Sequence, residues 1–321
     1  MNLEDIILSM MTYKGKPAKI QQLTIPTDKR VICISDIHGS LDLFVQLLGK
    51  VGFSGDDILI LIGDLFMRGT QCHETLKYII ELSRKDNVHA VMGNWDAVRP
   101  YYLTGAEAEW LDNLPQIIET QDYVFVHGGL TSNNLHEQDA LTCMKNDAFI
   151  DQGLSFEKYI VTGHWPTANY CHEIPSNNPF IDREKRIIAV DGGIVIRASG
   201  QLNAFIISDG AFSFEYVDAL PVIQVQKAQP ESGRLHITWN DRFVELVSAG
   251  EEFSIYRHLE TGKTLSLPND SVWTDEDGNL CAADGTDYHL HVEVGDNISV
   301  VKTFNGKLLA KKNGILGWVN L

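Results

Sequence analysis

The sequence predicts an α/β fold with a second, smaller all-β domain, and three observations lead to that class. Apolar strands alternate with amphipathic helical stretches in the first half of the chain, which is typical of an α/β core with a partly parallel sheet. Residues 234–321 contain short alternating strands separated by Asn, Asp and Gly turns. A chain of 321 residues is also long for one compact core, so a large domain and a small one are expected.

The elements of the large domain follow from hydrophobic periodicity. Residues 1–30 predict a short amphipathic helix and a polar lead-in. Helical spacing recurs over residues 41–52 and 72–85, between apolar runs that indicate buried strands. From Val124 onward the strands follow one another more closely. The predicted strands lie within residues 30–40, 56–69, 88–96, 123–130, 158–166, 186–193, 202–210 and 212–219.

The second domain is expected to begin after a linker, because residues 221–233 have linker composition. We therefore predict a large domain over residues 1–225 and an all-β accessory domain over residues 226–321. The C-terminal stretch pairs Gly-Asp before a Val-rich strand with later Asn-Gly and Gly-Trp-Val turns, and in this it resembles a bacterial SH3-like barrel. The resemblance implies a binding module for a protein partner or substrate, or a packing role alone. We expect Trp239, Trp273 and Trp318 in the core of this domain.

Charge and cysteine content exclude several classes of protein. The net charge of −17 argues against binding a nucleic acid polymer, which requires a basic surface. A phosphorylated substrate is still compatible, because bound cations invert the local charge of a site. The five cysteines are scattered and form no C-x-x-C pair, which favours a reducing compartment. No apolar run is long enough to span a membrane, so we predict a cytoplasmic protein without membrane contact.

Six polar residues share one setting, since each follows an apolar strand. In an open α/β sheet, ligands bind at the carboxyl ends of the strands. Carboxylate, imidazole and amide ligands together suit Mn, Fe or Zn, and one shared carboxylate could hold two ions about 3.5–4 Å apart. Taken singly, each residue is more often a helix cap or a turn; six together in this order predict a dinuclear centre. The six are Asp36, His38, Asp64, Asn94, His127 and His164.

The motifs around these residues resemble the calcineurin-like metallophosphoesterases. The matching stretches are Asp-Ile-His-Gly (36–39), Gly-Asp-Leu-Phe-Met-Arg-Gly (63–69), Gly-Asn-Trp-Asp (93–96), His-Gly-Gly-Leu (127–130) and Gly-His-Trp-Pro (163–166). The resemblance covers about residues 30–218, including Val-Asp-Gly-Gly (190–193). It is greatest to bacterial and phage-type serine/threonine phosphatases and to symmetrical diadenosine tetraphosphatases. It implies a four-layer α+β sandwich and a catalytic role for residues 1–225.

The resemblance also implies a role for each residue. Asp36, His38 and Asp64 would hold the first metal, and Asp64 would bridge to a second held by Asn94, His127 and His164. Two divalent ions are expected, Mn²⁺ first and Fe or Zn as alternatives. A hydroxide shared by the ions would attack phosphorus in line. Arg68 would clamp phosphoryl oxygens, a role that suits its planar fork of donors, and Asn94 would also touch the substrate.

The sequence departs from the family pattern where the general acid is expected. The histidine of Gly-Asn-His-Glu/Asp is Trp95, and the aspartate that often orients it is Met67. An indole donates a hydrogen bond but cannot act as a general acid, so Trp95 is expected to pack beside the metals or stack on an aromatic leaving group. In the segment that often supplies a second arginine, Asn146 stands at the arginine and Lys145 beside it. Lys145 is a candidate phosphate contact, with a solvated surface lysine as the alternative.

Asp96 has two interpretations. It either supports a metal-binding histidine from outside the coordination sphere or caps a helix.

Three functions follow from these motifs. The first is a two-metal phosphomonoesterase of the serine/threonine-phosphatase type that lacks the His/Asp acid dyad. The second is a dinucleoside polyphosphate hydrolase or a phosphodiesterase. The third belongs to another class: a pseudo-phosphatase that binds phosphorylated ligands without turnover, suggested by the missing dyad and the added β domain.

Overall fold

The computed structural model describes residues 3–100 and 102–321, and the side chains from residue 7 onward. It divides into two compact units. The first unit comprises Met1–Thr167 and Asn178–Ala219, and the second comprises Ala168–Asn177 and Leu220–Leu321. A short segment from the middle of the chain therefore belongs to the C-terminal unit, which no composition shift indicated.

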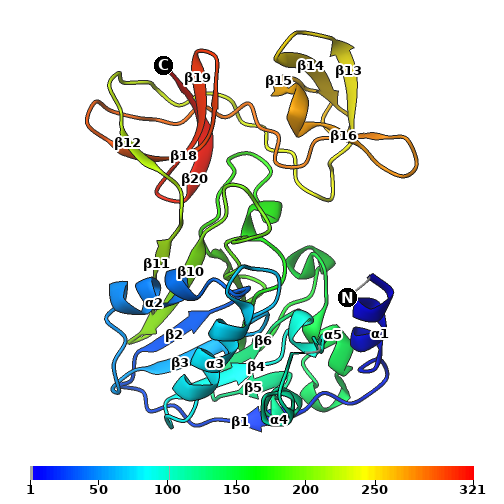
Figure 1. Ribbon diagram of the computed structural model, residues 1–321, viewed down its shortest axis with the longest axis vertical. Helices are drawn as coiled ribbons and strands as arrows, with labels where there is room; N and C mark the ends of the chain where they lie inside the picture. The colour runs from blue at the N-terminus through cyan, green and yellow to red at the C-terminus, as the bar shows by residue number, and fades with distance from the viewer. Residues whose placement is uncertain (1–2, 101) are drawn as a thin grey trace. The chain divides into compact units, whose positions relative to one another are not determined.

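Two mixed sheets form the first unit (Figure 1), with strand orders β1-β5-β6-β7-β9-β8 and β11-β10-β2-β3-β4. Strands β2, β3 and β4 are parallel, as are β6, β7 and β9, so the predicted α/β class is confirmed. The strands of the first sheet are β1 (Ile20–Gln22), β5 (Ile117–Glu119), β6 (Tyr123–Val126), β7 (Tyr159–Thr162), β8 (Phe180–Asp182) and β9 (Ile187–Ala189). Those of the second are β2 (Val31–Ile34), β3 (Ile58–Ile62), β4 (Val88–Val91), β10 (Leu202–Ser208) and β11 (Ala211–Val217).

Alternation along the central strands builds two apolar layers. In β2, Ile32 and Ile34 pack with the apolar face of the helices, including Phe44 and Leu76. Val31 and Cys33 point to the opposite face and pack with residues of the other sheet such as Phe125, as the two-residue period of a strand requires. The helices are α1 (Leu3–Met11), α2 (Leu41–Lys50), α3 (Cys72–Leu82), α4 (Gly105–Asn113) and α5 (Ala140–Met144). Because both faces of β2 and β3 are buried, their carboxyl ends are held rigidly.

One ion pair fixes the start of two central strands, and it predicts a pH-dependent contribution to stability. Arg30 donates to Asp57 through Nε (2.8 Å) and Nη2 (2.9 Å), directly before β2 and β3. The hydrogen bond from Arg30 holds the pKa of Asp57 below its ordinary value. A lowered folded-state pKa adds stability above the ordinary pKa, and that stability is lost as the pH falls. We expect Asp57→Asn to lower the unfolding free energy by about 1.5–3 kcal/mol at pH 7. Urea unfolding should show that the difference in unfolding free energy between variant and wild type shrinks below about pH 4. A difference that stays constant with pH would contradict this role of the ion pair.

The second unit contains strands and no α-helix in the range Leu220–Leu321, as predicted. One sheet has the order β12-β18-β19-β20, a second β13-β14-β15, and β16 pairs with β17. The bounds are β12 (Val222–Gln224), β13 (Val244–Ser248), β14 (Phe253–His258), β15 (Thr264–Pro268), β16 (Trp273–Thr274), β17 (Leu280–Cys281), β18 (Asn297–Phe304), β19 (Lys307–Lys312) and β20 (Ile315–Asn320). A barrel of the SH3 type remains a prediction.

Two features of this unit correct the sequence analysis. Val222–Gln224, inside the predicted linker, forms the edge strand β12 paired with β18; its side chains are all exposed, so it lacks the alternation that marks a half-buried strand. Of the three tryptophans expected in the core, Trp318 is buried. Trp239 and Trp273 are 46% and 39% exposed and stack on each other with centroids 6.2 Å apart, so the prediction is wrong for these two.

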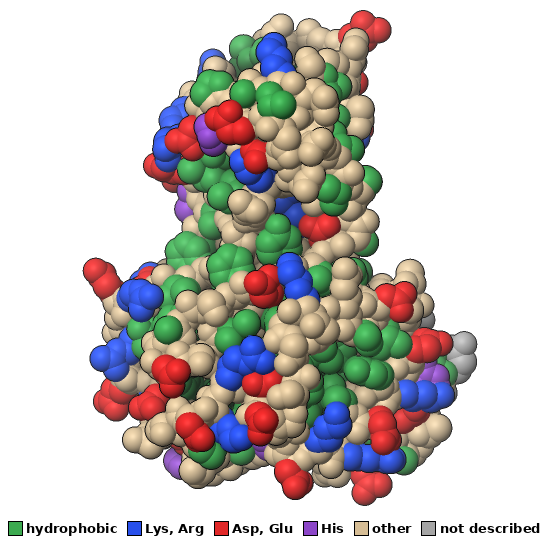
Figure 2. Space-filling model, turned by 90° about the vertical axis from the view of Figure 1, so that its left-hand side faces the viewer, with side chains coloured by type: hydrophobic (Ala, Val, Ile, Leu, Met, Phe, Trp, Pro, Cys, Tyr) green, Lys and Arg blue, Asp and Glu red, His purple; other side chains and the backbone are tan. Residues whose placement is uncertain are grey.

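In residues 3–100 and 102–321 we find no helix with the length and apolar character needed to cross a bilayer. On the face drawn in Figure 2, acidic and basic side chains are interspersed without a continuous block of positive charge. That face therefore offers no extended basic footprint of the kind that a nucleic acid polymer requires.

Candidate metal centre

All six predicted ligands lie in loops that follow strands at one edge of the first unit. They come after β2, β3, β4, β6 and β7 in turn. Asp36, His38, Asp64, Asn94 and His127 are buried, and the side chain of His164 is 10% exposed. The structure brings five of the six into two adjoining groups that share Asp64, and Asn94 lies beside the second group.

The first group consists of Asp36, His38 and Asp64. Nε2 of His38 lies 3.7 Å from Oδ1 of Asp36 and 3.8 Å from Oδ2 of Asp64. Both distances are too long for hydrogen bonds, yet they suit two ligands that each approach one cation at about 2.0–2.2 Å. Within the described chain, Oδ1 of Asp36 and Nε2 of His38 are buried without a hydrogen-bond partner. Two buried ligand atoms without hydrogen-bond partners fit a metal site.

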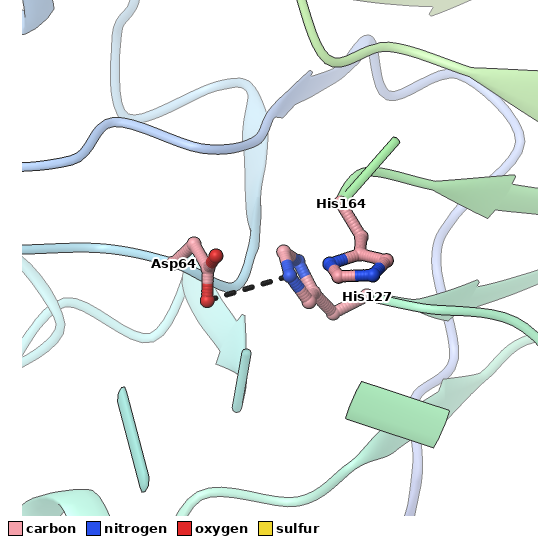
Figure 3. A group of neighbouring side chains, drawn as sticks. All are labelled: Asp64, His127 and His164. Carbon is pink, nitrogen blue, oxygen red and sulfur yellow. Dashed lines mark ion pairs between the residues drawn. The ribbon is translucent and has the colours of Figure 1, made fainter. Parts of the chain in front are cut away.

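The second group consists of Asp64, His127 and His164, with Asn94 beside it. Nε2 of His127 lies 3.4 Å from Oδ1 of Asp64 and 3.2 Å from Oδ1 of Asn94. Figure 3 shows the ring of His164 beside that of His127, with ring centroids 5.3 Å apart. One ligand atom from each of Asp64, His127 and His164 lies within 4.8 Å of the others.

The buried carboxylates of the centre favour a nearby positive charge. Burial opposes protonation of His127, but the carboxylates of Asp64 and Asp36 raise its pKa to about 10. Burial raises the pKa of Asp36 well above its ordinary value, and the nearby charge of Asp191 adds to the effect. Burial lowers the pKa of His38 to about 4, which leaves its imidazole neutral and able to bind a metal. Divalent cations would supply the positive charge that these carboxylates require.

The ligand loops have strained backbones, which are typical of functional sites. The positive φ angles are 54° at Asp36, 47° at His38, 52° at Asp64, 92° at Arg68 and 66° at His164. Such angles are uncommon for residues other than glycine. Gly93 permits a close approach between two of these loops, because a Cβ there would lie 2.2 Å from the backbone nitrogen of Asp64. The short distance explains why the Gly-Asn turn needs glycine.

Asp96 braces two of these loops. Its carboxylate accepts hydrogen bonds from the backbone nitrogens of Leu65 and Gly93, both at 2.9 Å. Burial and the charge of Asp64 raise its pKa to about 6. These are backbone contacts, so Asp96 holds the turns that carry Asp64 and Asn94. Its support of a metal-binding histidine stays a prediction.

Arg68 and Trp95 form a pair at the position of the missing acid. Cζ of Arg68 lies 4.8 Å from the centroid of the indole, within cation–π range. The backbone nitrogen of Trp95 donates to Oδ1 of Asp64 at 2.8 Å. Met67 contributes through its backbone, since its carbonyl lies 3.0 Å from Nδ1 of His38. Trp95 therefore supports the arginine that the sequence analysis assigned to phosphate.

Lys145 is linked to the metal centre by Asp147, a residue that the sequence analysis did not select. Its Nζ lies 2.6 Å from Oδ1 of Asp147, and Nε2 of His164 lies 2.7 Å from the same oxygen. The hydrogen bond from His164 holds the pKa of Asp147 below its ordinary value. Lys145 thus has a carboxylate partner, and its role as a phosphate contact stays a prediction.

Asp191 is a second residue that the sequence analysis did not select. Its side chain is fully buried, and Oδ1 accepts from the backbone nitrogen of Gly193 at 2.7 Å. Burial raises its pKa to about 6. Asp191 follows strand β9, so the strand-end rule that selected the six ligands would also have found it. Asp147 follows a helix rather than a strand, and no such rule selects it.

A separate hollow of about 840 Å³ lies at the opposite ends of the same strands. It is lined by residues that precede β2, β6 and β7, among them Lys29, Asp122 and Lys158. Because ligands of α/β sheets bind at the carboxyl ends of strands, and the Asp and His groups lie there, we place the chemistry at the metal centre rather than in this hollow.

Two Asp/His groups that share a carboxylate define the class of site found in dinuclear metal hydrolases. A family model described as calcineurin-like phosphoesterase matches residues 29–194, just over half of the chain. A symmetrical bis(5'-nucleosyl)-tetraphosphatase of Chromobacterium violaceum is 31% identical over 150 residues, covering 40% of this chain and 52% of that protein. A zinc-dependent endopolyphosphatase of Saccharomyces cerevisiae is 33% identical over 96 residues, covering 29% and 28%. A solved serine/threonine phosphatase from Saccharomyces cerevisiae aligns with a TM-score of 0.45 at 14% identity, covering 68% of this chain and 89% of that one.

The chain therefore belongs to the calcineurin-like phosphoesterase family. Enzymes of this family are metal-dependent phosphoesterases with a dinuclear divalent centre, so the predicted class of enzyme is confirmed at the level of the family. The chain spans about half the length of the first of these curated relatives and 28% of the second. The particular metal and the particular phosphate compound are therefore matters for proposal.

Proposed function

We propose that this protein is a two-metal phosphohydrolase for substrates whose leaving group departs without protonation. The observation that carries the proposal is the pair of Trp95 and Arg68 at the position of the missing acid. A phosphoanhydride releases a weakly basic phosphate, whereas a phosphoserine releases a strongly basic alkoxide. General acid catalysis contributes typically about 10²–10⁴-fold, and an alkoxide leaving group depends on it most.

The residues of the site would bind the cations, neutralise the phosphate and hold the substrate in position. The bound cations would polarise the phosphoryl group and lower the pKa of a water from 15.7 to about 7. Asp36, His38 and Asp64 would hold one cation, and Asp64, Asn94, His127 and His164 the other. Arg68 would neutralise the phosphoryl oxygens, held in place by the face of the Trp95 indole. Mn²⁺ is our first choice of metal, and the zinc-dependent relative makes Zn²⁺ the first alternative.

Dinucleoside polyphosphates are the substrate class that we favour. The curated relatives include symmetrical tetraphosphatases and an endopolyphosphatase, and both names denote hydrolysis of phosphoanhydride bonds. The absence of an acid at Trp95 supports the same chemistry. A phosphomonoesterase of the serine/threonine-phosphatase type is the second candidate, supported by the order of the motifs.

A substrate panel on protein loaded with Mn²⁺ tests the proposal. We expect turnover of diadenosine tetraphosphate and p-nitrophenyl phosphate, and rates on a phosphoserine peptide at least about 10²-fold lower. Equal rates on the peptide would favour the second candidate. If two bound metals are found but none of the substrates is hydrolysed, the protein is instead a phospholigand-binding pseudo-phosphatase.

A further inference from the structure

We propose that Asp147 is the positioning residue that selects the tautomer of His164 and thereby prepares the second metal position. The inference rests on the proposed two-metal function. Each of the three histidines in the centre has one ring nitrogen within 3.0 Å of a backbone or carboxylate oxygen. Metal-binding histidines commonly donate their other ring N–H to a carboxylate or carbonyl, which fixes the tautomer and orients the ring.

Two of the three histidines use the backbone for this purpose. Nδ1 of His38 lies 3.0 Å from the carbonyl of Met67, and Nδ1 of His127 lies 2.7 Å from the carbonyl of Ile62. A backbone carbonyl only accepts, so in both rings Nδ1 carries the proton. When the ring is neutral, Nε2 is the nitrogen with a lone pair for a metal. No side-chain substitution removes these two acceptors.

His164 has the opposite arrangement. Its Nε2 lies 2.7 Å from Oδ1 of Asp147, and an ionised carboxylate also only accepts. Nε2 therefore carries the proton, which leaves Nδ1 with the lone pair for a metal shared with Asp64 and His127. The acceptor is a side chain, so His164 is the histidine whose tautomer a single substitution can release.

Contacts on both sides of Asp147 fix its position beside His164. The backbone nitrogen of Gly128, next to His127, donates to the carbonyl of Cys143 at the end of α5. Ala148 then turns the chain with a φ of 52°, and Phe149 is buried against Gly129, where a Cβ would lie 2.6 Å from the ring. The segment is thus fixed at both ends to the loop that carries His127.

Lys145 completes the arrangement and offers a control. Its Nζ shares Oδ1 of Asp147 with His164, so it holds the carboxylate without touching the histidine through a bond of its own. Loss of Lys145 removes a charge from the same segment but leaves the acceptor for His164 in place.

Two measurements test the inference without relying on turnover. Calorimetric titration of chelator-treated protein with Mn²⁺ should show that Asp147→Ala weakens the second equivalent by about 10–100-fold and leaves the first nearly unchanged. Asp147→Asn, which keeps an acceptor oxygen, should lie between. In this metal titration, Lys145→Ala, which keeps the acceptor for His164, and the remote surface variant Asp56→Ala should resemble wild type. Long-range ¹H–¹⁵N correlation spectra of metal-free protein at pH 8 should show His164 as the Nε2–H tautomer, assigned with His164→Gln.

The outcomes separate this inference from the proposed function. If wild type binds two Mn²⁺ ions and Asp147→Ala binds both equally well, the inference is wrong and the two-metal function stands. An Nδ1–H tautomer of His164 in wild type overturns the inference whatever the metal content. If wild type does not bind two ions, the proposed function fails, and the spectra still decide the role of Asp147. Because Asp147 is half exposed, the variants should fold, and their melting temperatures check this.

Discussion

Replacing Asp64 by asparagine should abolish hydrolysis, with kcat reduced by at least about 10³-fold on every substrate. Asp64 supplies an oxygen to each of the two Asp/His groups, so its loss weakens both metal positions at once. An asparagine has one carbonyl oxygen and an amide nitrogen that cannot bind a metal. Without two cations a water would lose its lowered pKa and the phosphoryl group its polarisation. Metal analysis should show at most one equivalent where wild type holds two.

The control is a carboxylate of the same type away from the centre. Asp56 is almost fully exposed, and its contact is a surface pair with Lys29. Asp56→Asn should therefore keep both metals and full turnover, since surface pairs contribute little. Full activity of Asp64→Asn with two metals bound would show that Asp64 does not bridge.

Replacing Trp95 by histidine should raise turnover of an alkyl phosphate, and much less that of p-nitrophenyl phosphate. A histidine there can protonate a leaving oxygen, and acid catalysis contributes typically about 10²–10⁴-fold. The aspartate that orients this histidine in relatives is Met67 here, so we expect only about 10-fold to 10²-fold from the single change. Adding Met67→Asp should raise turnover of the alkyl phosphate further. This second substitution leaves in place the backbone carbonyl of residue 67, which faces His38.

Trp95→Phe separates the two roles of this position. A phenyl ring keeps an aromatic face for the guanidinium of Arg68 but cannot donate a proton. It should resemble wild type on both substrates, whereas the smaller imidazole of Trp95→His, which repels Arg68 when protonated, should raise KM for both. Faster turnover of alkyl phosphate by Trp95→Phe would contradict the view that an acid at this position limits the reaction.

The sequence predicted the large domain well because its strands are buried on both faces. Val31–Ile34 and Ile58–Ile62 are continuous apolar runs that end in polar residues, which is how central parallel strands are recognised. The three-residue strands Ile20–Gln22 and Phe180–Asp182 were not predicted individually, since three residues show no period. The edge strand Val222–Gln224 could not be told from a linker, because all three of its side chains are exposed.

The predicted ligands come together in the structure, whereas the contacts of their supporting residues could not be predicted. Asp36, Asp64 and His127 follow strands, and parallel strands bring their ends to one edge. Asp96 was selected, but its partners, the amides of Leu65 and Gly93, are distant in sequence from each other. Asp147 lies 17 residues before His164 in an irregular segment, and no pattern links the two.

The sequence by itself determined the α/β class, the all-β second part and the set of residue types at the strand ends. Those follow from periodicity and chemistry that each residue carries locally. Only the tertiary structure decided that Trp95 supports Arg68, that Trp239 and Trp273 are exposed, and that Asp147 faces His164. The physical reason is that these contacts join loops distant in sequence. Their geometry depends on how the sheets and turns pack, and no local pattern records it.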